Sequence, residues 1–295
     1  MKTIIPYLTT VFLMLSCSAQ NPDIVAEGAE LTLAAEGFEF TEGPAVAENG
    51  DVYFTDQPND RIIKWTAEDN SVTDWMSPSG RSNGLYFDQN GDLISCADEK
   101  NELWRIDGEK NVTVLVDNFQ GKKLGGPNDV WVHPNGSMYF TDPFYKRPWW
   151  DYEKPEINER RVYYRDQNGN VTIADNDFVM PNGIIGNTAG TVLYVADIGD
   201  KKTYKYNIQP NGDLTDRVLF CELGSDGMTL DNQGNVYLTG NGVTVFDASG
   251  QQIHHIAVPE KWTANVTFGG PDQNILFITA MDAIYTLEMA VNGIR

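Results

Sequence analysis

The segment Gly50-Asp51-Val52-Tyr53-Phe54-Thr55-Asp56 decides the fold, because its pattern recurs along the chain. A turn residue opens it, apolar and polar residues alternate, and a small or acidic residue ends it, which is typical of a short β-strand. The copies are spaced by about 40–45 residues, the length of one four-stranded propeller blade, and one interval is longer. The further copies are residues 91–98, 136–142, 190–197, 234–240 and 274–280.

Each copy is followed by two more alternating runs that are joined by a polar turn. In the third unit, 162–164 leads through the Asn-Gly turn of 166–170 to 171–173, and such turns are typical of hairpins. The final unit has only 283–289 after its repeated strand, so 31–35 is expected to supply the missing outer strand. We therefore predict an all-β fold, a six-bladed β-propeller of four-stranded antiparallel blades closed by the N-terminal strand. A β-sandwich is the competing fold, but it would not repeat one motif in this way.

The amino terminus has the pattern of a targeting signal. Lys2 precedes an apolar stretch over 4–15, and residues 1–16 are expected to be a secretory signal peptide. Cys17 directly after Ser16 predicts a lipoprotein, with lipidated Cys17 as the first mature residue, although an ordinary signal with an incidental Cys is the alternative. This predicts export to the bacterial cell envelope, in the periplasm or as an outer-membrane lipoprotein, with membrane contact only through the anchor. Residues 18–28 would form a tether and 29–295 a single propeller domain.

The composition excludes some classes of function and ligand. The 295 residues include 42 Asp and Glu against 21 Lys and Arg, a net charge of −21, which argues against binding nucleic acid. Three His leave little room for a histidine-rich zinc site. Cys96 and Cys221 either form a disulfide, which export permits, or remain buried free thiols. No feature of the sequence indicates an oligomeric state.

Polar residues recur about 13 positions before the end of each repeated strand. In a propeller the innermost strands start near the central channel, so these side chains are expected to converge there. They could be only turn residues, but the same register in consecutive blades favours a site. The set offers oxygen ligands alone, which suit Ca²⁺ best, then Mg²⁺ or Mn²⁺, and Zn²⁺ least. Its members are Glu42, Asn83, Asn128, Asp129, Asn182, Asp226 and, in the sixth blade, Thr267.

Several of these motifs give the chain a family resemblance. From about residue 37 to 280 it resembles the gluconolactonase/regucalcin-like family of six-bladed propeller lactonases. The motifs that carry the likeness, in family order, are Glu42-Gly43-Pro44, Pro127-Asn128-Asp129, His133-Pro134-Asn135-Gly136, Pro181-Asn182-Gly183, Ser225-Asp226-Gly227 and Phe268-Gly269-Gly270.

The resemblance implies a set of roles for these residues. One divalent metal, Ca²⁺ first with Mg²⁺, Mn²⁺ or Zn²⁺ as alternatives, would be coordinated by Glu42, Asn128, Asn182 and Asp226. Asp129 matches a polar position that lines the substrate site. The regucalcin branch has an Arg two residues before the Asn-Asp pair, where this chain has Gly126, so that substrate contact is absent. The implied substrate is a small sugar lactone.

Lactone hydrolysis passes through a tetrahedral oxyanion, which a bound cation stabilises. Asp226 is the first candidate for the base that activates water and Asp129 the second, while a covalent Asp nucleophile stays open. The sequence contains no Gly-x-Ser-x-Gly motif, which argues against a serine esterase. The alternatives are a non-catalytic envelope propeller that binds glycan or protein with a structural metal, and an esterase or phosphotriesterase with another substrate.

The long interval contains an insertion over residues 143–159 that is aromatic and cationic. It either covers its own apolar patch or forms a wall of the site. In the second case Tyr145 and Trp149, with Asn83, would contact the substrate, Trp149 by stacking on the sugar ring. Lys146 or Arg147 would then replace the missing Arg.

Overall fold

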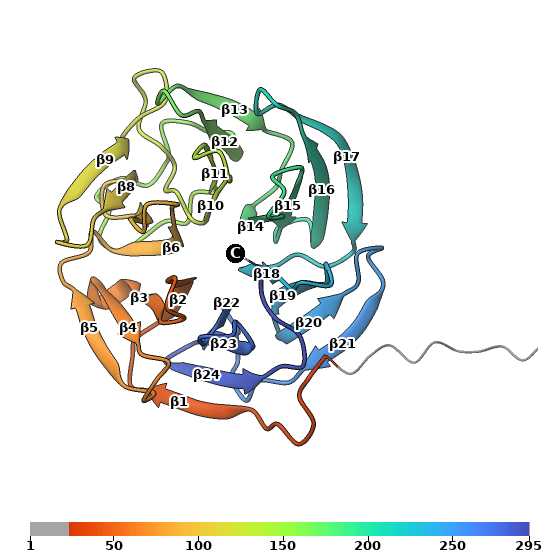
Figure 1. Ribbon diagram of the computed structural model, residues 1–295. Helices are drawn as coiled ribbons and strands as arrows, with labels where there is room; N and C mark the ends of the chain where they lie inside the picture. Colours follow the sequence, from red (N-terminus) through yellow and green to blue (C-terminus); the bar gives the residue numbers. More distant parts are fainter. Residues whose placement is uncertain (1–23, 295) are drawn as a thin grey trace, which may run out of the picture.

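The structure is a computed structural model that describes residues 24–294. Six four-stranded antiparallel sheets surround a central axis, whose surroundings are called the channel below, and the innermost strand of each sheet is the first of its blade (Figure 1). The predicted six-bladed propeller is confirmed. The first three blades comprise β2 (Thr41–Val46), β3 (Val52–Asp56), β4 (Arg61–Trp65) and β5 (Val72–Met76); β6 (Ser82–Phe87), β7 (Leu93–Ala97), β8 (Glu102–Ile106) and β9 (Val112–Val116); and β10 (Val130–Val132), β11 (Met138–Asp142), β12 (Arg161–Arg165) and β13 (Val171–Asp175).

The other three blades have the same order, and helix is limited to the single 3₁₀ turn η1 (Gln57–Asn59) within residues 24–294. The last blade takes its outermost strand from the start of the domain. These blades comprise β14 (Pro181–Gly186), β15 (Val192–Asp197), β16 (Lys202–Ile208) and β17 (Leu214–Cys221); β18 (Met228–Leu230), β19 (Val236–Gly240), β20 (Gly242–Phe246) and β21 (Gln252–Ile256); and β22 (Asn265–Gly269), β23 (Ile275–Ala280), β24 (Ala283–Glu288) and β1 (Thr32–Glu36).

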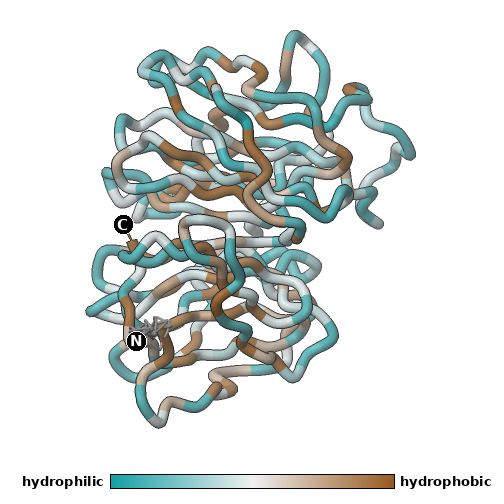
Figure 2. The backbone as a smooth tube through the Cα atoms, turned by 90° about the vertical axis from the view of Figure 1, so that its right-hand side faces the viewer, coloured by the Kyte–Doolittle hydropathy of each residue, from teal (hydrophilic) through white to brown (hydrophobic). Residues whose placement is uncertain are grey.

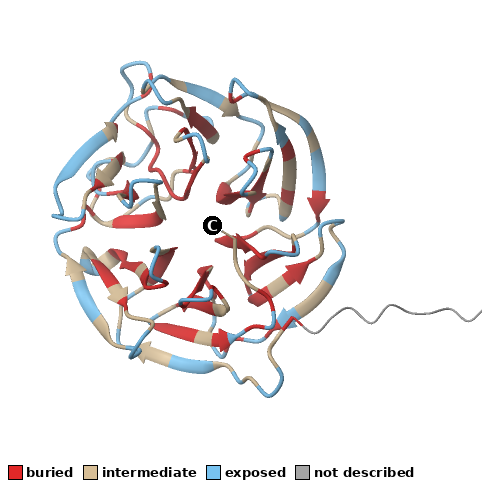
Figure 3. Ribbon diagram, viewed as in Figure 1, coloured by how far each residue is buried: buried red, intermediate tan, exposed pale blue. Residues whose placement is uncertain are grey.

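Burial falls from the channel outward within each blade (Figure 3). β7 is buried at every position, whereas most of β9 is exposed. The two faces of the inner strands pack between neighbouring blades; Trp131 and Tyr139 of the third blade, for example, pack with Ile184 of the fourth. Hydrophobic segments accordingly run through the interior and hydrophilic loops lie at the edges (Figure 2). The repeated alternating motif is therefore a set of second strands buried on both faces.

The ring closes between the two ends of the domain, as predicted. β1 pairs antiparallel with β24, with Leu33 opposite Tyr285, so the edge of the last blade is covered. Ile24 is buried and Val25 bridges Met289. The tether predicted over 18–28 is thus too long, because residues 24–26 already contact the propeller, whereas Glu27 and Gly28 are exposed.

The signal peptide over 1–16, lipidated Cys17 and the start of the tether lie outside the described residues. Within 24–294 the structure contains no helix that is both long and apolar enough to cross a membrane. Cys96 in β7 and Cys221 in β17 are both free and buried. Of the two alternatives left open for these cysteines, the structure shows free thiols.

The insertion lies between β11 and β12 and folds over the neighbouring second blade. Trp150 is buried, and its Nε1 donates to the carbonyl of Asp98 at 2.8 Å. Tyr152 Oη donates to Asn101 Oδ1 at 2.9 Å. The end of the channel at which the innermost strands begin is here called the mouth. Because β11 is antiparallel to the innermost strand β10, it ends at the mouth, and the insertion that follows β11 therefore lies there.

Candidate active site

The predicted site residues stand where the inner strands begin, at the mouth. Glu42, Asn83 and Asn182 are the second residues of β2, β6 and β14. Asn128-Asp129 directly precede β10, and Asp226 lies two residues before β18. Figure 1 shows these strands facing one another across the channel. The sequence thus predicted correctly that these positions converge on the channel.

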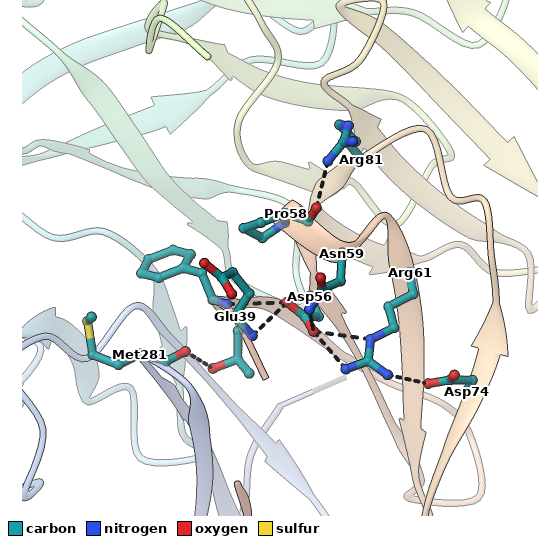
Figure 4. Close-up of polar contacts among 10 residues, drawn as sticks. Glu39, Asp56, Pro58, Asn59, Arg61, Asp74, Arg81 and Met281 are labelled. Carbon is teal, nitrogen blue, oxygen red and sulfur yellow. Dashed lines mark hydrogen bonds and ion pairs between the residues drawn. The ribbon is translucent and has the colours of Figure 1, made fainter. Parts of the chain in front are cut away.

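Aspartates that end the repeated strands fix the loops entering the inner strands. Asp56 Oδ1 accepts the backbone N–H groups of Glu39 and Phe40, just ahead of β2 (Figure 4). Asp197 accepts those of Val179 and Met180, just ahead of β14, at 2.8 Å each. The acidic residue at the end of the motif is therefore a structural group. It holds the loop that leads into the innermost strand of its own blade, and so positions the site residue at the start of that strand.

Three buried carboxylates, those of Glu42, Asp129 and Asp226, lie close enough around the channel for their charges to interact. Burial, reinforced by the negative charge of Asp226, raises the pKa of Glu42 well above its ordinary value. Burial raises the pKa of Asp129 to about 7. Burial also raises the pKa of Asp226 to about 6, against the opposing effect of hydrogen bonds from Trp262 and Asn182. Such a cluster favours a bound cation, which would stabilise all three charged forms.

Asn182 has an oriented side chain with an unused oxygen. Its Nδ2 donates to Asp226 Oδ1 at 2.6 Å and to Tyr145 Oη at 2.9 Å. Its Oδ1 is buried and has no hydrogen-bond partner. A buried acceptor without a partner costs about 1–3 kcal/mol, so this oxygen is suited to a ligand. The second oxygen of Asp226 accepts Trp262 Nε1 at 2.6 Å.

The four expected metal ligands fit a hard divalent cation by their chemistry. Glu42 and Asp226 supply carboxylates, Asn182 supplies its unpartnered Oδ1, and Asn128 has its backbone held by Thr141 and Gly84, which leaves its amide for the site. Within residues 24–294 no three His, Cys, Asp or Glu side chains are grouped closely enough to hold a metal among themselves. A cation here therefore needs the amide oxygens, a donor set of the kind that Ca²⁺ accepts.

In the sixth blade the residue that reaches the site is Asn265, not Thr267. Asn265 Nδ2 donates to Glu42 Oε2 at 3.1 Å, and Glu42 Oε2 also accepts the N–H of Gly43 at 2.6 Å. The backbone N–H of Asn265 donates a hydrogen bond to Thr279 Oγ1, just as the backbone N–H of Asp129 donates one to Thr141 Oγ1. The two spacings differ, 12 residues for Asp129 and 14 for Asn265, so counting along the chain does not find Asn265.

Asn265 and Asp129 occupy the same register, and in their neighbours that register is glycine. A Cβ on Gly84 would lie 2.6 Å from Asp129 Oδ1, and one on Gly227 would overlap the Asn265 side chain. Side chains at the start of one blade thus fill space that a glycine of the preceding blade leaves open. The glycine after each polar residue has a packing reason that turn chemistry alone does not supply.

The remaining predicted residues lie around the mouth. Asn83 is buried, and its carbonyl accepts Thr55 Oγ1 at 3.1 Å. Tyr145 contacts Asn182 directly. One guanidinium, that of Arg81, lies 4.5 Å from the ring centroid of Trp149, so an aromatic face expected to stack on sugar already has a neighbour. Sequence analysis did not single out Arg81 or Trp262.

Gly126 stands where the resemblance expects an arginine in regucalcin-like chains. A Cβ there would lie 2.8 Å from Asp98 Oδ1 and 2.9 Å from Trp150 Cη2. The insertion therefore uses the space beside this position. Arg147 of the same insertion pairs through Nε with Asp98 Oδ2 at 2.6 Å, which brings a guanidinium to the mouth from another segment.

The raised pKa of Asp129 makes the metal-free protein less stable as the pH rises. The folded state titrates Asp129 at a pKa of about 7, whereas the unfolded chain titrates it near its ordinary value. The folded state thus holds more protons between about pH 4 and 7, so the free energy of unfolding falls as the pH increases through that window. We expect a loss of at least about 2 kcal/mol between pH 5 and 8, measured by urea unfolding in EDTA.

Asp129→Asn is the control for this pH dependence. It removes the titration of Asp129 and should make the profile less steep, while the raised pKa values of Glu42 and Asp226 keep part of the slope. An equally steep profile in Asp129→Asn would place the titration on other groups.

The comparisons with known proteins agree with this geometry. The gluconolactonase of Zymomonas mobilis is 27% identical over 294 residues, covering 89% of this chain and 82% of that protein. The pentonolactonase XacC of Haloferax volcanii is 28% identical, covering 66% of each. A solved gluconolactonase structure from Xanthomonas campestris superposes with a TM-score of 0.83 at 27% identity, covering 90% of this chain and 91% of that one. The family model described as SMP-30/Gluconolactonase/LRE-like region matches residues 40–282, so the chain belongs to this family.

Proposed function

We propose that this protein is a metal-dependent hydrolase of sugar lactones that works at the mouth of the propeller. Its relatives named gluconolactonase and pentonolactonase support the reaction class. One observation supports the metal most directly: Asn182 turns its amide nitrogen to Asp226 and leaves its buried Oδ1 without a partner. Glu42, Asn128, Asn182 and Asp226 would hold the cation, with Ca²⁺ first among the candidates.

When bound, the cation would act as a Lewis acid for the lactone carbonyl and its oxyanion. Asp226 is the proposed base for water, since hydrogen bonds from Asn182 and Trp262 hold both of its oxygens in place. The proton that Asp226 takes from water would pass to the ring oxygen as the C–O bond breaks. Asp129, the second candidate for the base, is buried close enough to Asp226 for their charges to interact, and a bound cation would favour its charged form, which accepts a proton. The product is the open hydroxy acid.

The test is a panel of aldonolactones assayed after EDTA treatment and then with Ca²⁺, Mg²⁺, Mn²⁺ or Zn²⁺, against the spontaneous rate. We expect turnover that is lost in EDTA and restored first by Ca²⁺. No turnover of any lactone with any metal would refute the proposal. A metal that raises the melting temperature without any turnover would instead support a non-catalytic binding protein. Turnover of other esters or of phosphotriesters, but not of lactones, would support the alternative in which the enzyme has a different substrate class.

We also propose that the protein is exported as a lipoprotein, on the basis of Ser16-Cys17 after the apolar stretch. Full-length protein expressed in a bacterium should then fractionate with membranes and carry acyl mass on Cys17. Cys17→Ser should appear in the soluble fraction or remain unprocessed. Release of the unaltered protein without acyl mass would favour an ordinary signal peptide.

A further inference from the structure

A cluster of cationic and donor groups stands at the mouth of this acidic protein. Arg81 and Arg147 both approach the ring of Trp149, with their Cζ atoms 4.5 and 5.8 Å from its centroid. Arg81 directly precedes β6, and the other two belong to the insertion. In a chain of net charge −21, two guanidinium groups at one indole are an exception that calls for a reason.

Arg81 has no carboxylate partner. None of the ion pairs found among residues 24–294 includes it, its Nη1 donates to the carbonyl of Pro58 at 2.7 Å, and its Nε is buried without an acceptor. The nearby carboxylate of Asp56 is taken up by Arg61, Asn59 and the backbone of Glu39, as Figure 4 shows. The carboxylate of Asp60 is also close, but its Oδ1 accepts the backbone N–H of Arg81 at 2.7 Å. Within residues 24–294 no carboxylate therefore forms an ion pair with the Arg81 guanidinium.

Arg147 is held in place by one of its nitrogen atoms, which leaves its other donors available. Its Nε binds Asp98 Oδ2, which also accepts Gln57 Nε2 at 2.9 Å. The terminal amino groups remain for another partner, and the side chain is 21% exposed. Trp149 Nε1 is buried and has no acceptor either. The three residues therefore offer donors and positive charge but no acceptor, which is the chemistry that binds an anion.

This cluster adjoins the proposed active site. Arg147 Cζ lies 5.6 Å from the ring centroid of Tyr145, and Tyr145 Oη accepts Asn182 Nδ2. The chain of contacts from Asn182 through Tyr145 to Arg147 places the donors beside the site, on the side of the insertion. A group bound there would belong to the same small molecule whose lactone carbonyl reaches Asn182 and Asp226.

We propose that Arg81, Arg147 and Trp149 recognise an anionic substituent of the lactone, a carboxylate or phosphate at the end of the sugar away from the ring carbonyl. The inference rests on the proposed lactonase function and narrows its substrate class. A neutral hydroxyl would leave the Arg81 guanidinium without an ion-pair partner, whereas an anion accepts several of these donors at once. Because the overall charge repels anions, the preference must come from these local groups.

The test compares glucono-1,5-lactone with its 6-phosphate and with a lactone of glucaric acid, using metal-loaded protein. We expect kcat/KM to be at least about tenfold higher for the anionic lactones, the effect of one charge-assisted hydrogen bond. Arg81→Gln should lower the anionic-to-neutral ratio by about tenfold. The 6-phosphate and carboxylate arms distinguish the two anions.

Two further variants separate position from charge. Arg147→Lys keeps the charge beside Asp98 but removes the planar fork, so it should lower the ratio less than Arg81→Gln does. The matched control is Arg105→Gln, which removes a charged residue of β8 that is paired with Asp92. This variant should leave the anionic-to-neutral ratio unchanged. Inhibition by 6-phosphogluconate relative to gluconate supplies a readout of binding alone.

Each result decides the matter. Hydrolysis of the neutral lactone with no anionic preference, unaffected by Arg81→Gln, would overturn this inference and leave the lactonase proposal standing. Failure to hydrolyse either kind of lactone would refute the lactonase proposal, and this inference with it.

Discussion

Asp226→Asn is expected to lower kcat/KM for a sugar lactone by at least about 10³-fold, the scale of a lost general base. Both carboxylate oxygens of Asp226 accept hydrogen bonds from side chains, one from Asn182 and one from Trp262, at 2.6 Å each. An amide cannot take the proton from water and is a weaker ligand for a cation. Steady-state kinetics above the spontaneous rate, at saturating Ca²⁺, measure the effect.

The fold should survive this substitution, because Asn has the shape of Asp and can still accept one of the two hydrogen bonds. An unchanged circular dichroism spectrum and a melting temperature within a few degrees are the control. Asp129→Asn, measured beside it, tests the second candidate. If Asp226→Asn keeps activity within tenfold of the unaltered protein, the assignment of Asp226 as the base is wrong. If activity is lost in Asp129→Asn alone, Asp129 is the base instead.

The second large effect concerns the closure of the ring. A chain beginning at Phe38 lacks β1, whose pairing with β24 covers the edge of the last blade. It also lacks Ile24, which is buried against the last blades. We expect the free energy of unfolding to fall by at least about 3 kcal/mol, from lost apolar burial and lost strand hydrogen bonds. Urea unfolding followed by tryptophan fluorescence measures it.

The matched control is a chain beginning at Ile24, which keeps the closing strand and should unfold like the longer protein. A peptide of residues 24–37 added to the truncated chain should restore stability in a concentration-dependent way. Equal stability of the two truncations would mean that β1 does not hold the ring closed.

The fold was readable because each blade is nearly contiguous in the chain. Alternation within a strand and a Gly or Asn turn between strands are local properties, and six copies of Val52–Asp56 with its flanking turn therefore predict six sheets. The missing strand in the last copy predicted the closure. The tether boundary was misplaced because the burial of Ile24 depends on blades formed by the far end of the chain.

The candidate site was readable only where it repeats. Glu42, Asn128, Asn182 and Asp226 follow a common register, so the sequence predicted their convergence. Asn265 was missed in favour of Thr267 because Thr267 lies at the expected spacing of about 13 residues from the end of the repeated strand. Only the structure shows that the backbone N–H of Asn265 donates to Thr279 Oγ1 and that its side chain reaches Glu42.

The sequence by itself therefore determined the six-bladed architecture, the excess of acidic residues and the polar residues that meet at the mouth. Only the tertiary structure decided which groups meet across blades. Asn265 binds Glu42 from 223 residues away, and Arg147 on the insertion joins Arg81 of another blade at Trp149. The physical reason is that strand periodicity is set by neighbours in the chain, whereas contacts between blades are set by how the blades pack against one another, which no local pattern encodes.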